Sequence, residues 1–259
     1  MTSTEYEVQD QAAWIRLDRP ENRNALSAEL VNELYQHLQQ ALSDPLVRSI
    51  VITGNGTAFC AGADLKSPPG SSISGGGRAV PFGDVLQFML NANKPLIAAV
   101  NGAAFGGGIG LLAACDIIIA DEAAQFSFSE VRLGVIPAVI SVLVLPKIGA
   151  HQAKRLFLTG QRFSGQEAVK FGLVHQSVPS AALTSVVEKE LEAIALGGPN
   201  ALAECKKLIR EVPELSIEAG LARTSDWSVA MFESDEATEG MAAFREKRSP
   251  NWVQPGGAS

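Results

Sequence analysis

Short, continuous apolar runs followed by segments of small residues dominate the first half of the chain. Ser49–Thr53, Leu96–Val100 and Ile117–Ala120 have the length and composition of buried strands. The first two lead within a few residues to Ala58–Lys66 and Asn101–Gly108, whose glycines should let the chain turn sharply towards a helix. Strand, turn and helix therefore recur about every fifty residues, and such units can stack as turns of a superhelix. The pattern predicts an α/β fold.

Amphipathic periodicity predicts further elements around these strands. Ser27 is a good N-cap for a helix that runs to about Leu42, with its apolar side chains on one face. Glu5–Gln9 and Ala13–Leu17 predict a strand pair before that helix, and Asp84–Ala92 predicts a short helix before the second buried strand.

Beyond about residue 137 the pattern becomes mostly helical. Ser164-Gly165-Gln166-Glu167 has the form of a capping box. Four further helices are predicted, over Ser180–Leu196, Asn200–Arg210, Ile217–Ala230 and Asp235–Lys247. This part of the chain has many apolar positions and little sheet for them to cover, so the residues alone indicate an apolar-rich helical tail.

Composition and charge restrict the class of partner. An apolar fraction of 46% in 259 residues is ample for a core, and the formal charge of −7 without a basic cluster disfavours nucleic acid and anionic membranes. The apolar stretch Pro95–Ala120 contains Asn101, Asp116 and several glycines, which indicates buried strand, turn and helix rather than a membrane span. The N-terminus lacks the pattern of a signal peptide, so we expect a cytoplasmic location.

Neither metal nor dinucleotide binding is indicated. Cys60, Cys115 and Cys205 are too few and too scattered for a disulfide framework or a metal site, and their apolar surroundings predict buried thiols. The three histidines lie far apart and beside no motif. The run Gly106–Gly110 fails the dinucleotide pattern because Leu111 stands where a glycine is needed.

The segments of small residues also suggest chemistry. Free N–H groups at such turns can point at an anion, and two of them aimed at one point form an oxyanion hole. That arrangement can hold a thioester carbonyl while it becomes an enolate. Glu130 stands in an apolar stretch, and apolar surroundings raise the pKa of a carboxyl group towards the range in which it can shuttle protons.

At these positions the chain strongly resembles the enoyl-CoA hydratase/isomerase (crotonase) family. The matching segments keep the family's order and spacing over nearly the whole chain; they are Asn24–Ser27, Ala58–Lys66, Asn101–Gly108, Ala114–Ile117, Phe128–Pro137, Ala168–Val174 and Glu239–Phe244. The resemblance implies a ββα superhelical (spiral) core over residues 1–195 that holds the active site. It further implies a C-terminal helical region, residues 196–259, which covers the active site and joins chains into a homotrimer or a dimer of trimers.

The resemblance also implies site residues. Ala63 and Gly107 would supply the two oxyanion N–H groups, and Glu130 would be the acid/base carboxylate. The substrate and CoA contacts would come from Arg23, Ala25, Leu26, Ala61, Asp64, Leu65, Lys66, Phe244 and Lys247. The cations Arg23 and Lys66 suit nucleotide phosphates, although a solvated surface charge is an equal alternative for each. The pair Phe244 and Lys247 would reach CoA on a neighbouring subunit, or simply end an amphipathic helix. CoA is part of the substrate, so no separate cofactor and no metal is expected.

Gly110 departs from the family pattern. Family hydratases commonly carry a second glutamate at this position, and the two carboxylates together hold one water. The loop after Pro137 also lacks the aspartate that some relatives carry, because Ala138-Val139-Ile140 stands there. What remains is a one-carboxylate site, and Gly110→Glu is expected to add hydration of crotonyl-CoA if the position faces the substrate.

Three functions are compatible with this pattern. The first is an enoyl-CoA hydratase acting on a 2-enoyl-CoA, with a branched or carboxylated acyl group suggested by the Gly-Ile-Gly-Leu segment. The second is a Δ3,Δ2-enoyl-CoA isomerase with Glu130 as the sole proton shuttle. The third is a non-catalytic acyl-CoA-binding or RNA-binding member, which the absence of Lys and Arg from Ser27–Leu42 disfavours.

A last expectation concerns the segment Lys66–Pro81, which is rich in Gly, Ser and Pro. This composition predicts a mobile lid over the acyl pocket. Within it, Arg78 is either solvated or able to meet a carboxylate on the acyl group.

Overall fold

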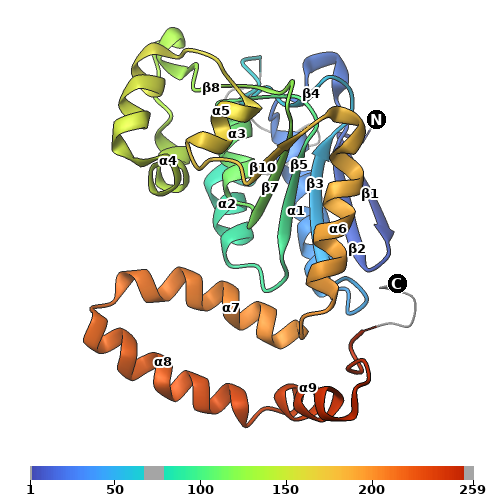
Figure 1. The fold of residues 1–259 in the computed structure, drawn as a ribbon. Helices are drawn as coiled ribbons and strands as arrows, with labels where there is room; N and C mark the ends of the chain where they lie inside the picture. Colours follow the sequence, from blue (N-terminus) through green and yellow to red (C-terminus); the bar gives the residue numbers. More distant parts are fainter. Residues whose placement is uncertain (1, 67–78, 254–259) are drawn as a thin grey trace.

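The computed structural model describes residues 2–66 and 79–253, and these residues form two sheets surrounded by helices (Figure 1). The larger sheet has the order β1-β2-β3-β5-β7-β10, and its strands are β1 (Thr4–Gln9), β2 (Ala12–Leu17), β3 (Ser49–Gly54), β5 (Leu96–Val100), β7 (Ile117–Asp121) and β10 (Gln176–Val178). The smaller sheet has the order β4-β6-β8-β9, and its strands are β4 (Ala58–Cys60), β6 (Ala103–Phe105), β8 (Gln125–Ser127) and β9 (Phe163–Ser164). The expected α/β class is confirmed.

Three successive ββα units connect the two sheets. In each unit the first strand joins the larger sheet, the second strand joins the smaller one, and a helix follows. The units are β3-β4 with α2 (Phe82–Leu90), β5-β6 with α3 (Gly107–Ala113), and β7-β8 with the 3-10 helix η2 (Glu130–Leu133) and α4 (Ala138–Thr159). Because β4, β6 and β8 are adjacent and parallel, their carboxyl ends lie at one edge of the smaller sheet.

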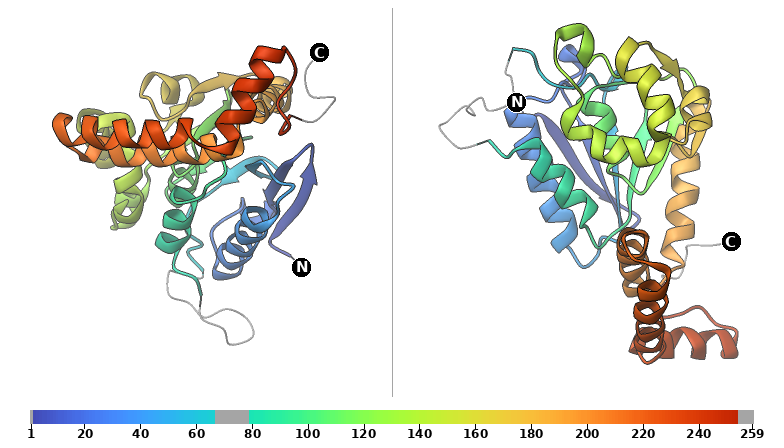
Figure 2. Two further views of the ribbon diagram at one scale, coloured as in Figure 1. Left: turned by 90° about the horizontal axis from the view of Figure 1, so that it is seen from below. Right: turned by 90° about the vertical axis from the view of Figure 1, so that its left-hand side faces the viewer.

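Both faces of the larger sheet are buried, as the continuous apolar runs predict. Alternate strand residues point to opposite sides, so that Ile50, Ile52 and Ala98 belong to the main core while Val51 and Ile97 belong to a second cluster. The main core contains the buried face of α1 (Ala28–Ser43), and the second cluster contains residues of α6 (Leu183–Ala195). Figure 2 shows α1 and α6 on opposite sides of the sheet.

Local capping signals in the sequence correctly predict two helix starts. The Ser27 side chain accepts a hydrogen bond from the Leu30 N–H at the start of α1. At the start of α5 (Gly165–Lys170), Ser164 and Glu167 form both hydrogen bonds of a capping box. The long helix α4 bends where Gly149 adopts a φ of 71°, three residues after Pro146.

The last three helices, α7 (Pro199–Glu211), α8 (Ile217–Phe232) and α9 (Asp235–Glu246), lie to one side of the two sheets, as Figures 1 and 2 show. They confirm the helices predicted there, but among them only Gly220 and Ala243 are buried. Many of their large apolar side chains are exposed, including Ile209, Ile217, Leu221, Val229, Phe232 and Phe244. We call α7–α9 the C-terminal arm.

Arginine and lysine side chains hold the arm to the rest of the chain. Arg48 donates hydrogen bonds to the Gly197 and Trp252 carbonyls, and Arg210 donates one to the Leu90 carbonyl. Lys206 forms an ion pair with Asp116. Polar contacts therefore anchor the arm, while its apolar faces stay open.

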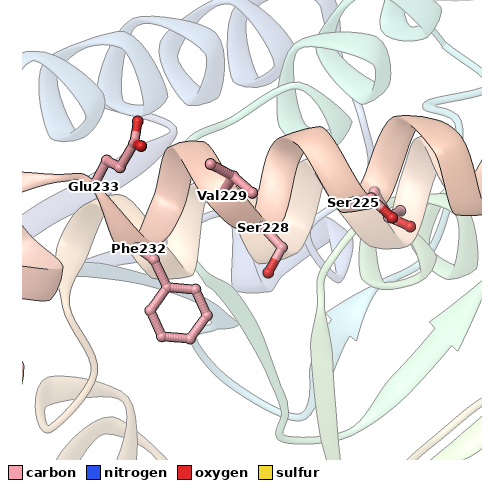
Figure 3. A pocket seen from close by; sticks show the side chains of 6 residues that line it. Ser225, Ser228, Val229, Phe232 and Glu233 are labelled. Carbon is pink, nitrogen blue, oxygen red and sulfur yellow. The ribbon is translucent and has the colours of Figure 1, made fainter.

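A hollow runs along α8 on this arm. It has a volume of about 540 Å³, and Figure 3 shows the side chains that line it, which are Thr224, Ser225, Ser228, Val229, Phe232 and Glu233. A second hollow of about 320 Å³ lies between Gly198, α8, α9 and Trp252. Neither hollow includes Glu130, so both belong to the arm and not to the candidate chemistry.

The three cysteines differ in exposure. Cys60 and Cys115 are buried, as expected, but Cys205 on α7 is exposed, so that expectation is wrong for Cys205. Its α7 position meets little of the core because the arm stands apart from the sheets. Among the described helices, none combines the length and the hydropathy needed to cross a lipid bilayer.

Candidate active site

The candidate groups lie after three neighbouring strands of the smaller sheet. Gly62 and Ala63 follow β4, Gly106 and Gly107 follow β6, and Glu130 follows β8. The strands pair with Ala104 between Cys60 and Phe126, and the register of β4 on β6 shifts by one residue between Ala58 and Cys60. Each ββα unit therefore delivers one part of the site to the same edge.

The strands that precede the two turns are not those that the apolar pattern suggested. Ser49–Thr53 and Leu96–Val100 are strands β3 and β5, but a short second strand, β4 or β6, follows each of them before the turn. These second strands occupy the beginning of the segments of small residues. The turns themselves are present.

The two turns are in van der Waals contact. Gly62 has a φ of +87°, and a Cβ atom placed on it would lie 2.7 Å from the Phe105 carbonyl oxygen and 3.3 Å from the Gly107 nitrogen. Leu26 lies beside both turns, because its N–H donates to the Gly62 carbonyl (2.7 Å) and its side chain closes on Gly107. A larger residue at either glycine would separate the turns.

Two backbone N–H groups at this edge are unpaired. Leu26 pairs with Ala63 as a parallel β-bridge, which uses the Asp64 N–H and leaves the Ala63 N–H free. Gly107 is the first residue of α3, a position whose N–H has no partner within the helix. Within residues 2–66 and 79–253, neither N–H reaches a hydrogen-bond acceptor.

The Glu130 carboxylate lies against the second turn. A Cβ atom on Gly106 would be 3.0 Å from Glu130 Oε1, so only glycine leaves room for this approach. Glu130 Oε2 is buried and has no hydrogen-bond partner among the described residues. Burial is the main cause that raises the pKa of Glu130 above the usual range of a glutamate, and a backbone hydrogen bond opposes it in part.

The apolar residues that follow Glu130 in the sequence are not the source of this burial, whereas Phe126 and Phe128, which precede it, are fully buried. Val131, Leu133, Val135 and Ile136 are all exposed in the single chain. They follow Glu130 through η2 and the loop after it, on the outer side of the molecule. The contact of the Glu130 carboxylate with Gly106 therefore contributes more to the burial of this carboxylate than these exposed side chains do.

Gly110 does not offer an open position for a second carboxylate. It is buried in α3, and a Cβ atom there would overlap Ile140 Cγ2 at the start of α4 and come within 3.7 Å of the Phe82 ring. The same ring lies 3.6 Å from the Cβ position of Gly107. Ile140 fills the space beside Gly110, so the condition for a gain of crotonyl-CoA hydration in Gly110→Glu, an open position that faces the substrate, is not met in this packing.

Gly110→Glu is expected instead to destabilise the fold by about 1–3 kcal/mol, the usual cost of overpacking a core, and Gly110→Ala to do so to a smaller extent. Urea unfolding measures the change. Gly83→Ala in α2 is the matched control, because its Cβ would meet nothing closer than Val139 at 3.8 Å. Alanine there should be neutral or stabilising through helix propensity. Equal stability of Gly110→Ala and Gly83→Ala would contradict the packing argument.

The structure places most candidate CoA contacts beside this edge. Ala25 and Leu26 are buried, Ala61 donates its N–H to the Arg23 carbonyl (2.9 Å), and Asp64 is mostly buried in the turn. Leu65 and Lys66 are exposed at its outer side. These residues therefore lie close to the Ala63 turn, some beneath it and some at its exposed side.

Phe244 and Lys247 are not brought to this turn. They lie on and just after α9, at the end of the molecule opposite to β4 and β8 (Figure 1). Within one chain they cannot contact a ligand at the candidate site. The lid predicted for Lys66–Pro81 and the role of Arg78 fall on residues 67–78, outside the described residues.

Three residues of this region escaped the sequence analysis. Phe82 at the start of α2 and Ile140 at the start of α4 look like ordinary apolar residues, and only their close approach to α3 reveals their place. Arg19 precedes Pro20 in a polar loop, and the sequence gives no sign of its contacts. Among residues 2–66 and 79–253, no group of three His, Cys, Asp or Glu side chains could hold a metal ion.

Comparisons with known proteins agree with the fold. The family model described as enoyl-CoA hydratase/isomerase matches residues 7–255. A putative enoyl-CoA hydratase of Thermus thermophilus is 35% identical over 93% of this chain and 96% of its own length. The carnitinyl-CoA dehydratase of Proteus mirabilis is 37% identical over 92% of this chain and 93% of its own.

The solved structures give the same result. The crystal structure of a putative enoyl-CoA hydratase/isomerase (crotonase) from Legionella pneumophila superposes with a TM-score of 0.87 at 37% identity, covering 97% of this chain and 99% of that one. The expected crotonase-like spiral of ββα units is confirmed by this similarity.

Proposed function

The chain belongs to the enoyl-CoA hydratase/isomerase family, and on that premise we propose that it adds water across the double bond of a 2-enoyl-CoA thioester. The observation that carries the proposal is the meeting of three strand ends. Two of them present N–H groups, and the third a buried carboxylate oxygen, for which the described residues offer no hydrogen-bond partner. Such a set can bind a carbonyl oxygen and move a proton beside it.

In this reaction the Ala63 and Gly107 N–H groups donate to the thioester oxygen. The ionised Glu130 takes a proton from water while the water oxygen bonds to C3, and the double-bond electrons move towards the thioester oxygen as an enolate. The Glu130 carboxylic acid then gives a proton to C2, which restores the thioester. Both donors gain strength as negative charge grows on the oxygen, so they favour the transition state over the substrate.

Double-bond isomerisation is the second candidate, and the contact between Gly110 and Ile140 favours it. That contact leaves no room for a second carboxylate on α3, so Glu130 stands without the partner acid that a two-carboxylate site would hold there. A single carboxylate can remove a proton from C2 of a 3-enoyl-CoA and return it at C4, with no water held between two acids. A purely binding member is disfavoured because the proposed groups are all present, and α1 carries neither Lys nor Arg.

A substrate panel distinguishes these functions. The purified protein is offered crotonyl-CoA, 3-methylglutaconyl-CoA and a 3-enoyl-CoA, and the absorbance of the conjugated thioester is followed. Loss of absorbance with either of the first two substrates supports hydration, and a gain with the third supports isomerisation. No change with any of them, in protein that binds CoA thioesters, would contradict both enzymatic functions. The panel also tests the proposed branched or carboxylated acyl group.

We also propose that residues 1–195 form the catalytic core and residues 196–259 assemble the chain into a homotrimer or a dimer of trimers. The arm exposes Ile217 and Phe244, each 85% accessible, together with other large apolar side chains. Soluble monomers rarely expose so much apolar surface, so a second copy of the chain is the natural cover. Phe244 and Lys247 would then reach CoA on a neighbour, while Arg23 and Lys66 bind the phosphates of their own. A cytoplasmic location stays a prediction of the sequence.

Sedimentation equilibrium tests the assembly. Wild-type protein is expected to contain three or six chains, and Ile217→Ser/Leu221→Ser is expected to shift the distribution towards monomers because it removes apolar contact area. Val8→Ser, at an exposed apolar position of β1, should leave the mass unchanged. A monomeric wild-type protein would contradict the assembly and, with it, the proposed contact of Phe244.

A further inference from the structure

Arg19 links the loop before α1 to the turn that carries Ala63. Its Nη1 donates to Ser27 Oγ (2.8 Å) and lies 3.8 Å from Asp64 Oδ2, while its Nε lies 3.5 Å from Glu21 Oε1. The Arg19 side chain is 29% exposed and that of Asp64 is 13% exposed. The pair is therefore largely shielded from water.

The Asp64 carboxylate organises the turn from within. Its Oδ1 accepts the Lys66 N–H (3.0 Å), and its Oδ2 lies 3.5 Å from the Asn22 side-chain amide. Its own backbone N–H donates to the Leu26 carbonyl at 3.3 Å. Asp64 directly follows Ala63, and through the Lys66 N–H its carboxylate helps to fix the backbone of this turn.

The backbone of Arg19 is fixed as firmly as its side chain. Its N–H donates to Asn24 Oδ1 (2.8 Å), and its carbonyl accepts the Asn24 N–H (2.9 Å). Asn24 is fully buried and donates its side-chain amide to the Ala58 carbonyl (2.8 Å) on β4. Through Asn24, the backbone of Arg19 is thus held in a fixed position relative to β4, the strand that leads into the Ala63 turn.

The opposite charges of Arg19 and Asp64 matter for the chemistry of the turn as well as for its geometry. A poorly hydrated carboxylate one residue from Ala63 would repel the negative charge that grows on a thioester oxygen during enolate formation. The Arg19 guanidinium opposes that repulsion, because it lies against the same carboxylate. We propose that Arg19 is a positioning residue for the oxyanion-binding turn: it fixes Asp64 and compensates its charge. The inference rests on the proposed role of the Ala63 N–H.

Three variants separate charge compensation from a simple ion pair. Arg19→Gln leaves Asp64 charged and unopposed, and we expect kcat to fall by about tenfold or more with KM changed less than threefold, the scale of one lost ion pair that is partly shielded from water. Asp64→Asn should lower kcat less than Arg19→Gln does, because the asparagine amide oxygen can still accept the Lys66 N–H. The double variant should recover part of the activity that Arg19→Gln loses.

A second measurement does not depend on turnover. Butyryl-CoA is saturated and cannot be hydrated, and donors on its carbonyl oxygen lower the carbonyl stretching frequency in the infrared difference spectrum. With isotope-labelled butyryl-CoA, Arg19→Gln should lose part of this shift and the double variant should regain it. If wild-type protein shows the shift but hydrates nothing, the proposed function fails while the Arg19 inference is still decided by the spectrum.

Arg16→Gln is the matched control. Arg16 pairs with Glu7 at 3.9 Å and its side chain is 33% exposed, but it lies in β2 away from the turn, so kcat and the infrared band should not change. Arg19→Lys keeps the positive charge and should retain more than a third of wild-type kcat. If Arg19→Gln does not fold, the kcat of Arg19→Lys tests whether the charge at this position is what matters. Equal losses in Arg19→Gln and Asp64→Asn without recovery in the double variant, or loss in Arg19→Lys as large as in Arg19→Gln, would overturn the inference.

Discussion

Replacing Glu130 by glutamine should lower kcat by about 10²–10⁴-fold and leave KM nearly unchanged, the usual worth of a general acid/base. The amide keeps the size of the side chain and its place against Gly106, but it cannot take a proton from water or return one to carbon. Because Gly110 provides no second carboxylate and the Asp64 carboxylate lies against Arg19, we expect neither position to substitute for Glu130. The loss should therefore appear with every substrate that the wild-type enzyme accepts.

The pH dependence gives this prediction a second test. Burial raises the pKa of Glu130, and the ionised form is the base, so kcat/KM should fall as the pH drops through this raised pKa. This fall of kcat/KM at acidic pH should be absent in Glu130→Gln. A raised pKa also means that the ionised Glu130 destabilises the folded protein, whereas an ion-paired carboxylate would stabilise it. This destabilisation is absent at a pH below the pKa of Glu130 in the unfolded chain. It is complete at a pH above the raised pKa of Glu130 in the folded protein. At neutral pH the variant should thus be at least as stable as wild type.

Glu122→Gln is the matched control, because Glu122 is an exposed glutamate just after β7. Its activity and pH profile should equal those of the wild type. If Glu130→Gln retains more than a tenth of wild-type kcat on the best substrate, Glu130 is not the proton shuttle.

Gly62→Ala should lower kcat by about 10²–10³-fold, the usual cost of losing one oxyanion donor. The new methyl carbon would start 2.7 Å from the Phe105 carbonyl oxygen and 3.3 Å from the Gly107 nitrogen, so it forces the two turns apart. The Ala63 and Gly107 N–H groups could then no longer point at one oxygen. A displacement of this size matters because the donors must match the position of the developing charge.

Gly149→Ala is the control for Gly62→Ala, because it introduces backbone strain without separating the two turns of the site. Gly149 has a φ of +71° and Gly62 one of +87°, so alanine is strained at both, but a Cβ on Gly149 meets nothing within 4 Å. Both variants should lose about 1–3 kcal/mol of stability because alanine is strained at a positive φ, and Gly149→Ala should keep wild-type kcat per folded molecule. Comparable kcat in the two variants would show that contact between the turns is not needed for catalysis.

Elements with strong local signals could be predicted from the sequence. The apolar runs identified β3, β5 and β7, and the caps at Ser27 and Ser164 fixed two helix starts. The short strands β4, β6 and β8 could not be found in this way, because three residues are too few to show a period. Their pairing depends on the stacking of units that lie far apart along the chain.

The same distinction holds within the site. Ala63, Gly107 and Glu130 were singled out by motif and resemblance, and the structure brings them to one edge, while their roles remain predictions. The contact of Ile140 with Gly110 depends on the distance between α3 and α4, which no local pattern contains. Arg19 is a similar case, since its significance lies in Asp64, forty-five positions later in the chain.

The unequal exposure of the cysteines gives the protein a built-in attachment point for an optical reporter. Burial raises the pKa of Cys60 to about 12 and also raises the pKa of Cys115, so neither forms a reactive thiolate near neutral pH. A thiol-selective dye should therefore react at Cys205 alone, without engineering of the chain. Because Cys205 lies on α7, the fluorescence of this single label would follow the arm as chains associate, and its rate of attachment would report how far that surface is covered.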